Sequence, residues 1–189
     1  MMRVHDVHSR ELPAPVERAW ELVAGLASEH DELWPVERWP TTPIEFDRPL
    51  GPGARGGHGV IRYDVERYEQ GRRVVFRFAT DSGLDGIHAF EVEPIDARRS
   101  RLTHVLDTRV GWKLRPLQGL LRAAHEALIE DLLDNAERAV GCNPAPPPPL
   151  PRLLRVANAV EGGVIRLRRA ARPRRSAPGP AVLGRGGQS

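Results

Sequence analysis

Two histidines sit among apolar residues on one face of a predicted β-hairpin. The stretch "GIHAFEVEPIDARRSRLTHVLDT", residues 86–108, alternates as two strands joined by a polar turn. His88 shares a face with Phe90 in the first strand, and His104 shares one with Leu102 in the second. A neutral imidazole donates a hydrogen bond from one nitrogen and accepts at the other. The pair is therefore suited to orienting a carbonyl or hydroxyl group of a ligand, or to moving a proton.

A structural role for the two histidines is the alternative, in which they satisfy each other or the backbone inside a filled core. Burying a polar group without a partner costs about 1–3 kcal/mol, so a partner is required in either case. We expect no metal at His88 and His104, because no third ligand lies at a recognisable spacing from them. We also expect no cofactor. The stretch "GPGARGGHG", residues 51–59, lacks the phosphate-binding pattern GxxxxGK[ST] and is interpreted as a glycine-rich bend in a sheet.

The elements around this hairpin follow one another along the chain in a simple order. A strand over residues 3–12 is followed by a helix with an apolar stripe that includes Ala19, Trp20 and Val23. A second short helix is predicted in "SEHDELWPV", starting at Ser28 and ending before Pro35. Five strands follow.

A long helix then runs from Pro116 to Gly141. Its apolar stripe recurs at helical spacing and contains Leu117, Leu120, Leu121, Ala124, Leu128, Leu132, Asn135 and Ala139. His125 flanks this stripe, and Glu130 and Asp131 are expected to face water. The order predicts an α+β fold in which a curved antiparallel sheet of about six strands wraps around the long helix. The enclosed space is either filled by side chains or left as a cavity.

Composition restricts the class of protein and divides the chain. The 189 residues include one cysteine, Cys142, and no apolar run long enough to span a membrane, so we expect a cytoplasmic protein. Residues 142–189 carry nine arginines and one acidic residue, which leaves residues 1–141 net acidic. We therefore expect one folded domain over residues 1–141, and a Pro/Arg-rich tail over 142–189. The tail is predicted to be a stiff linker with a possible short helix, largely disordered.

The chain resembles the START-like, Bet v 1-like helix-grip superfamily, in particular its SRPBCC, polyketide cyclase/dehydrase-like branch. The resemblance rests on four stretches: "ELPAPVERAWELVAGL", "GPGARGGHGVIRYDVERYEQGRRVVFRF", "HAFEVEPI…SRLTHVLD" and the closing long helix. It implies a cavity between sheet and long helix that binds lipids, polyketides or other apolar small molecules. The implied ligand contacts are Trp34, Tyr63, Phe76, Phe78, His88, Phe90, His104 and Leu121.

Three classes of function follow. The first is a binding or carrier module for one apolar, lipid- or polyketide-like molecule. The second is a cyclase or aromatase in which His88, His104 or Tyr63 moves protons. The third is an interaction module in which the arginine-rich tail contacts a protein, an anionic membrane surface or a nucleic acid.

Overall fold

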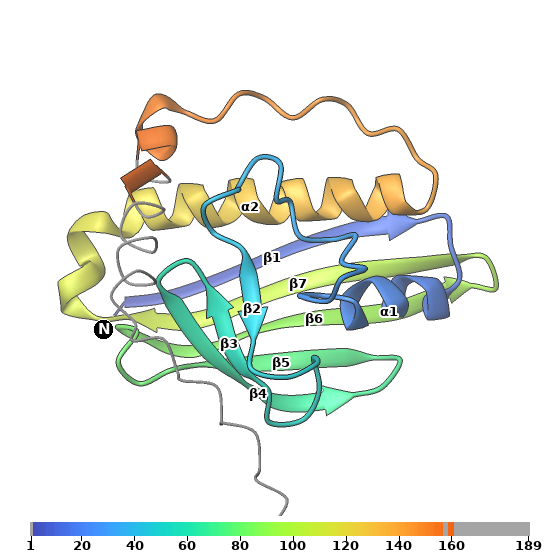
Figure 1. The fold of residues 1–189 in the computed structure, drawn as a ribbon, viewed down its shortest axis with the longest axis horizontal. Coiled ribbons are helices and arrows are strands. Elements are labelled where there is room, and N and C mark those ends of the chain that lie inside the picture. Colours follow the sequence, from blue (N-terminus) through green and yellow to red (C-terminus); the bar gives the residue numbers. More distant parts are fainter. Residues whose placement is uncertain (1, 157–158, 161–189) are drawn as a thin grey trace, which may run out of the picture.

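The computed structural model describes residues 2–156 and 159–160. Its core is one antiparallel sheet with the strand order β1-β7-β6-β5-β4-β3-β2, curved around the long helix α2 (Figure 1). The strands are β1 (Met2–Leu12), β2 (Ile44–Phe46), β3 (Arg55–His58), β4 (Ile61–Glu69), β5 (Arg73–Phe78), β6 (Leu84–Asp96) and β7 (Arg99–Val110). The helices are α1 (Val16–Ala24), the 3-10 helix η1 (Trp112–Leu117) and α2 (Gln118–Ala139). The predicted α+β helix-grip fold is confirmed.

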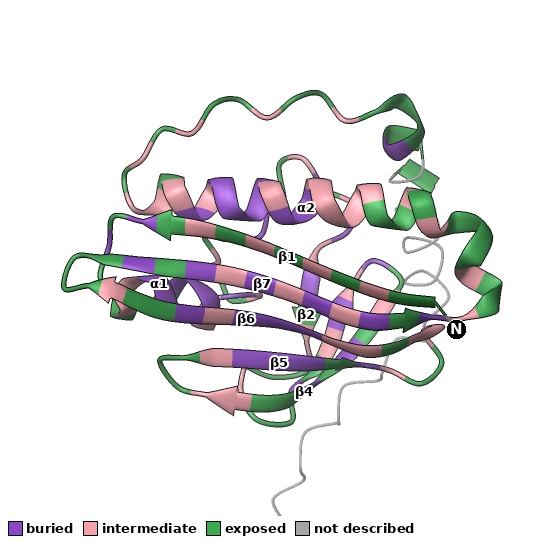
Figure 2. Ribbon diagram, turned by 180° about the vertical axis from the view of Figure 1, so that it is seen from behind, coloured by how far each residue is buried: buried purple, intermediate pink, exposed green. Residues whose placement is uncertain are grey.

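The central hairpin has the predicted alternation of faces. In β6 and β7, Phe90 pairs with His104 and His88 pairs with Leu106, so the two histidines lie diagonally across the ladder on one face. That face is buried, whereas Asp107 and Arg109 lie on the other face of β7. Figure 2 shows buried residues alternating with less buried ones along β7. Strict alternation along both strands produces this division, because successive side chains of a strand point to opposite faces.

The sheet has seven strands in the described part of the chain because the glycine-rich stretch forms β3 instead of a bend alone. A β-carbon at Gly56 would lie 1.9 Å from the Glu45 carbonyl oxygen, and one at Gly57 would lie 2.0 Å from the Ile61 carbonyl oxygen. Only glycine permits the neighbouring backbones to approach this closely. The strand therefore lacks the β-branched and aromatic residues that usually reveal one in a sequence.

The predicted second short helix is wrong. Residues 28–35 form turns organised by the carboxylate of Asp31, which accepts hydrogen bonds from the backbone N–H groups of Ala27, Leu33 and Trp34 at 2.8–2.9 Å. The Ser28 hydroxyl accepts from the His30 N–H at 3.1 Å, which is a local turn and not a helix cap. Short polar side chains that bond nearby backbone groups compete with helix formation, and here they win.

The long helix begins later than predicted. Pro116 lies inside η1, and α2 proper starts at Gln118. The apolar stripe is buried only in the second half of α2, where Leu128, Leu132 and Ala136 lie in the core. Near its start, Leu117 and Leu121 are 50% and 36% exposed, so this end of the helix borders solvent.

The first residues after α2 run back across it in an extended conformation (Figure 1). The Pro148 carbonyl accepts a hydrogen bond from Arg38 at 3.0 Å, and Leu150 packs against the core. A helical turn follows at residues 152–156. The predicted disorder of the remaining tail falls largely on residues 161–189, outside the described residues. No helix in the described ranges is both long and apolar enough to cross a membrane.

Candidate functional site

A cavity of about 200 Å³ lies between the concave face of the sheet and α2. Its walls come from all seven strands, the loop after α1, and the first half of α2. The eight side chains expected to contact a ligand all border it: Trp34, Tyr63, Phe76, Phe78, His88, Phe90, His104 and Leu121. Their binding role stays a prediction, but the fold does bring them to one space.

His88 lies at the centre of an aromatic cluster on the sheet. Its ring packs edge-on against Tyr63, with ring centroids 4.4 Å apart, and stacks on Phe76 at 4.7 Å. Phe78 lies 5.2 Å away on the same strand as Phe76. These side chains point inward because β4, β5 and β6 pair in register there, with Tyr63 opposite Phe78 and Phe76 opposite His88.

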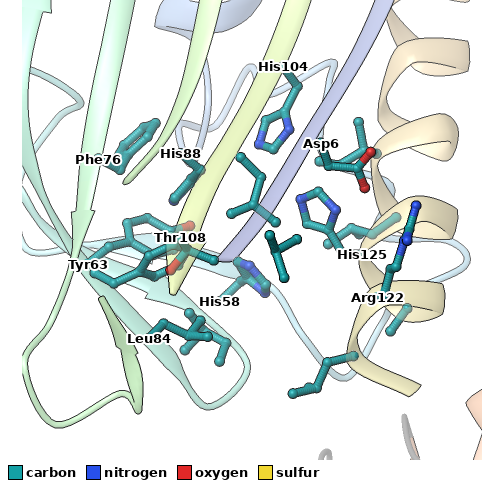
Figure 3. Close-up of a pocket in the computed structure, with 18 of the residues that line it drawn as sticks. Asp6, His58, Tyr63, Phe76, Leu84, His88, His104, Thr108, Arg122 and His125 are labelled. Atoms are coloured by element: carbon teal, nitrogen blue, oxygen red, sulfur yellow. The ribbon is translucent and has the colours of Figure 1, made fainter. Parts of the chain in front are cut away.

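A row of histidines continues from this cluster toward α2. The ring of His104 lies 5.7 Å from that of His88 and 5.1 Å from that of His125, and His125 lies 6.2 Å from His8 (Figure 3). On the opposite side, His58 packs against Trp34 at 5.1 Å. Four imidazoles, from β3, β6, β7 and α2, thus border one cavity, and His8 of β1 lies behind them next to His125.

Many polar atoms around the cavity are buried without a hydrogen-bond partner among the described residues. Four belong to the sheet wall beside the aromatic cluster, namely the Tyr63 hydroxyl, His88 Nε2, His104 Nδ1 and Thr108 Oγ1. Three more gather at the side near α2, namely Asp6 Oδ2, His8 Nε2 and His125 Nδ1. Each unpaired buried polar group lowers the stability of the fold by about 1–3 kcal/mol. Such groups are rare in folded proteins, so a cluster of them around one cavity indicates a functional site.

Burial keeps the sheet wall uncharged. It lowers the pKa of His58 to about 4, and it holds the pKa of His88 and His104 well below the ordinary histidine value. The neighbouring histidines lower these pKa values further. Burial also raises the pKa of Tyr63. At neutral pH the wall therefore offers hydroxyl and imidazole groups that donate and accept hydrogen bonds, and no charge.

The two tryptophans of "ELWPVERWP" close one end of the cavity. Trp34 donates from Nε1 to the Thr42 carbonyl at 3.1 Å, and Trp39 donates from Nε1 to Asp131 at 2.8 Å. Asp131 also pairs with Arg38 at 3.1 Å. The expectation that Asp131 faces water is wrong, because the loop carrying Arg38 and Trp39 covers it. Glu130 is half-exposed and contacts His8 and Arg10.

Sequence reasoning missed several residues that border the cavity. His58 lies in the glycine-rich stretch, where no alternating apolar pattern indicates which way a side chain points. Thr108 shares the strand face of His104, as the alternation along this strand predicts, and it borders the cavity as well. Asp6 and His125 come from β1 and α2, and nothing in their local spacing shows that they meet.

The architecture and the enclosed cavity define a class, the SRPBCC or Bet v 1-like helix-grip proteins. Within it, the chain belongs to the family described as polyketide cyclase/dehydrase and lipid transport, whose sequence profile matches residues 3–141. A comparison with curated protein sequences gives no match.

Solved structures agree on the fold. CalU16 from Micromonospora echinospora is 15% identical with a TM-score of 0.53, over 85% of this chain and 84% of that one. Norcoclaurine synthase from Thalictrum flavum is 13% identical with a TM-score of 0.56, over 74% and 87%. One structure of that enzyme holds dopamine and hydroxybenzaldehyde.

Proposed function

We propose that the protein binds one small, mainly apolar molecule carrying carbonyl or hydroxyl oxygens, of the polyketide or lipid type, in the cavity under α2. The observation that carries the proposal is the set of unpartnered polar atoms on the sheet wall: Tyr63 hydroxyl, His88 Nε2, His104 Nδ1 and Thr108 Oγ1. A hydrocarbon would leave these atoms unpaired. A ligand with two or more oxygen atoms would pair with them and recover the free energy that their burial costs.

The cavity volume limits the size of the ligand. An apolar cavity of about 150 Å³ holds a benzene molecule. A space of about 200 Å³ therefore suits one ring with a few substituents, or a short folded chain. Aromatic faces from Phe76 and Phe78 would contact the apolar part.

A cyclase or aromatase activity is the second candidate, in which His88, His104 or Tyr63 moves protons while a polyketide chain closes and loses water. The family description favours it, as does a hydroxyl donor beside two imidazoles. Binding ranks first because burial lowers the pKa of His88 and His104 and raises the pKa of Tyr63, which makes all three poor at exchanging protons near pH 7. Histidines with a strongly lowered pKa are weak bases.

Native mass spectrometry followed by solvent extraction tests the proposal. A co-purifying oxygen-containing compound at one copy per chain is the expected result. Its affinity is then measured by calorimetry in wild type and in Tyr63→Phe, for which we expect an affinity loss of about tenfold, the worth of one hydrogen bond. Tyr68→Phe is the matched control, because Tyr68 packs against Trp20 and does not border the cavity.

The outcomes separate the two candidates. Recovery of the compound unchanged after long incubation supports a carrier, whereas conversion over many turnovers that is lost in His88→Gln or His104→Gln supports an enzyme. A mass without ligand, together with no thermal shift from a panel of phenols and polyketide-like ketones, would overturn both.

A role for the arginine-rich tail stays a prediction. Residues 142–189 carry nine arginines, and an anionic membrane surface or a nucleic acid is the partner such a charge suits. Vesicle co-sedimentation at low and high salt, with and without residues 161–189, tests it. The predicted cytoplasmic location is tested by fractionation.

A further inference from the structure

A second group of side chains lies where β1 passes under α2. Asp6 and His8 are two residues apart in β1 and therefore point to the same face of the strand. His125 projects toward them from α2 (Figure 3). One oxygen of Asp6 and one ring nitrogen from each histidine lie within 4.8 Å of one another. The Asp6 and His8 side chains are only 16% and 14% exposed, so water does not readily solvate them.

The atoms that face one another in this group have no hydrogen-bond partner among the described residues. Asp6 Oδ2, His8 Nε2 and His125 Nδ1 are each buried and unpaired. His8 Nδ1 lies 2.7 Å from a carboxylate oxygen of Glu130, a distance at which the nitrogen donates its proton. In a neutral imidazole the opposite nitrogen then holds a lone pair, and here it faces Asp6 Oδ2 at 3.6 Å. Two electron-rich atoms that close repel each other unless a proton or a metal ion lies between them.

We propose that Asp6, His8 and His125 form a binding site for a divalent transition-metal ion such as Zn²⁺. Two imidazole nitrogens and one carboxylate oxygen are a ligand set that such ions accept, with further positions left for water or substrate. Bonds of about 2.0–2.2 Å place the ligand atoms of a tetrahedral zinc about 3.4 Å apart. The 3.6 Å separation of Asp6 and His8 is close to this geometry, and the distances to His125, which are within 4.8 Å, would have to shorten on binding.

The surroundings of His8 resemble the support that metal-binding histidines usually have. Glu130 accepts from its distal nitrogen, which fixes the ring orientation and the tautomer that leaves Nε2 free. Arg10 holds Glu130 in place at 2.9 Å and also contacts Asp134 and Glu137 on the same helix. We assign Glu130 as a positioning residue that acts through His8.

The site opens onto the cavity, because Asp6 and His125 are among its lining residues. The free coordination positions of the ion would face the same space as His104. An ion there could take an oxygen of the ligand and polarise it. This extension rests on the proposed function, whereas the metal site itself does not.

Zinc titration of the full-length protein, stripped with EDTA and free of organic ligand, tests the site. Isothermal calorimetry should show one Zn²⁺ per chain. Asp6→Asn and His125→Gln should each weaken binding by more than 100-fold, and Glu130→Gln by roughly 10–100-fold, the range for outer-shell partners. His5→Gln is the matched control, because this histidine lies on the same strand but is 56% exposed, and its affinity should equal wild type.

Spectroscopy of the wild type keeps the test decisive if a variant fails to fold. Cobalt substitution should give visible absorption bands, and zinc should shift the ¹⁵N resonances of His8 Nε2 and His125 Nδ1. Absence of stoichiometric uptake would overturn the site, as would binding that is equal in Asp6→Asn, His125→Gln and wild type. An imidazolium at His8 bridging Glu130 and Asp6 would then explain the cluster. Because no organic ligand is present, failure here leaves the proposed small-molecule binding untouched.

Discussion

The imidazole of His88 lies edge-on against the phenol ring of Tyr63, yet neither the Tyr63 hydroxyl nor His88 Nε2 has a hydrogen-bond partner among the described residues. Ring packing therefore holds both groups in position in the wall of the cavity. This pairing of rigid apolar contact with unsatisfied polar atoms is a feature of a binding wall, and it gives the first prediction.

Removing the Tyr63 hydroxyl should stabilise the ligand-free protein. In Tyr63→Phe the ring contacts remain and an unpaired buried group disappears, so the free energy of unfolding should rise by about 1 kcal/mol. Urea denaturation in the absence of ligand measures the change. A loss of stability would show that the hydroxyl has a partner in the ligand-free protein and would remove it from the proposed wall.

The buried histidines should make the protein sensitive to acid. Burial lowers the pKa of His58 to about 4, so the unfolded chain takes up a proton first as the pH falls below about 6.5. The stability that depends on neutral His58 is complete above that pH and is lost progressively down to about pH 4. The slope is about 1.4 kcal/mol per pH unit for each such group.

Unfolding free energies between pH 7 and pH 4.5, measured with EDTA present, test this pH dependence. His58→Phe should reduce the slope of the unfolding free energy against pH by the contribution of one histidine. His88→Phe should do the same, because burial also lowers the pKa of His88. The exposed His30 provides the control, and His30→Gln should follow wild type. An unchanged slope in both cavity variants would mean that these histidines titrate equally in the folded and unfolded chains.

The hydrogen bond from Trp39 to the buried carboxylate of Asp131 should stabilise the protein in addition to the packing of the Trp39 ring. Trp39→Phe keeps most of the apolar surface but removes the donor to a buried carboxylate, so we expect a loss of about 1.5–3 kcal/mol. Trp112→Phe is the control, because Trp112 is 75% exposed and should be neutral. Thermal and urea unfolding of the two variants give the comparison. Equal stability of both would show that Arg38 alone satisfies Asp131.

Strand parity explains why the sheet side of the cavity could be predicted from the sequence. Once residues 86–108 are recognised as a hairpin, alternation alone places His88 and His104 on the same face, and the same rule places Tyr63 and Phe76 inward. The fold class follows from the order of strands and helices. Both inferences need only local periodicity and chain order.

Helix rotation and backbone proximity explain what could not be predicted. His125 is one residue from the apolar stripe. Whether it faces the core or water depends on the rotation of α2 about its own axis where it packs on β1. Its proximity to Asp6 is likewise a product of tertiary packing. The strand at Gly56 and Gly57 follows from backbones in close contact, and the turns at Asp31 follow from side-chain bonds that outcompete a helix. None of these has a periodic signal.

The segment after α2 should contribute to folding, although its composition suggests a spacer. Leu154 is 3% exposed, whereas its neighbour Leu153 is 65% exposed. Leu154→Ala should therefore lower the free energy of unfolding by about 2–5 kcal/mol, the usual cost of truncating a buried leucine. Leu153→Ala should change it by less than about 0.5 kcal/mol, as surface substitutions do. Urea unfolding of the two variants supplies the matched comparison, and equal effects would show that residues 142–156 act only as a linker in solution.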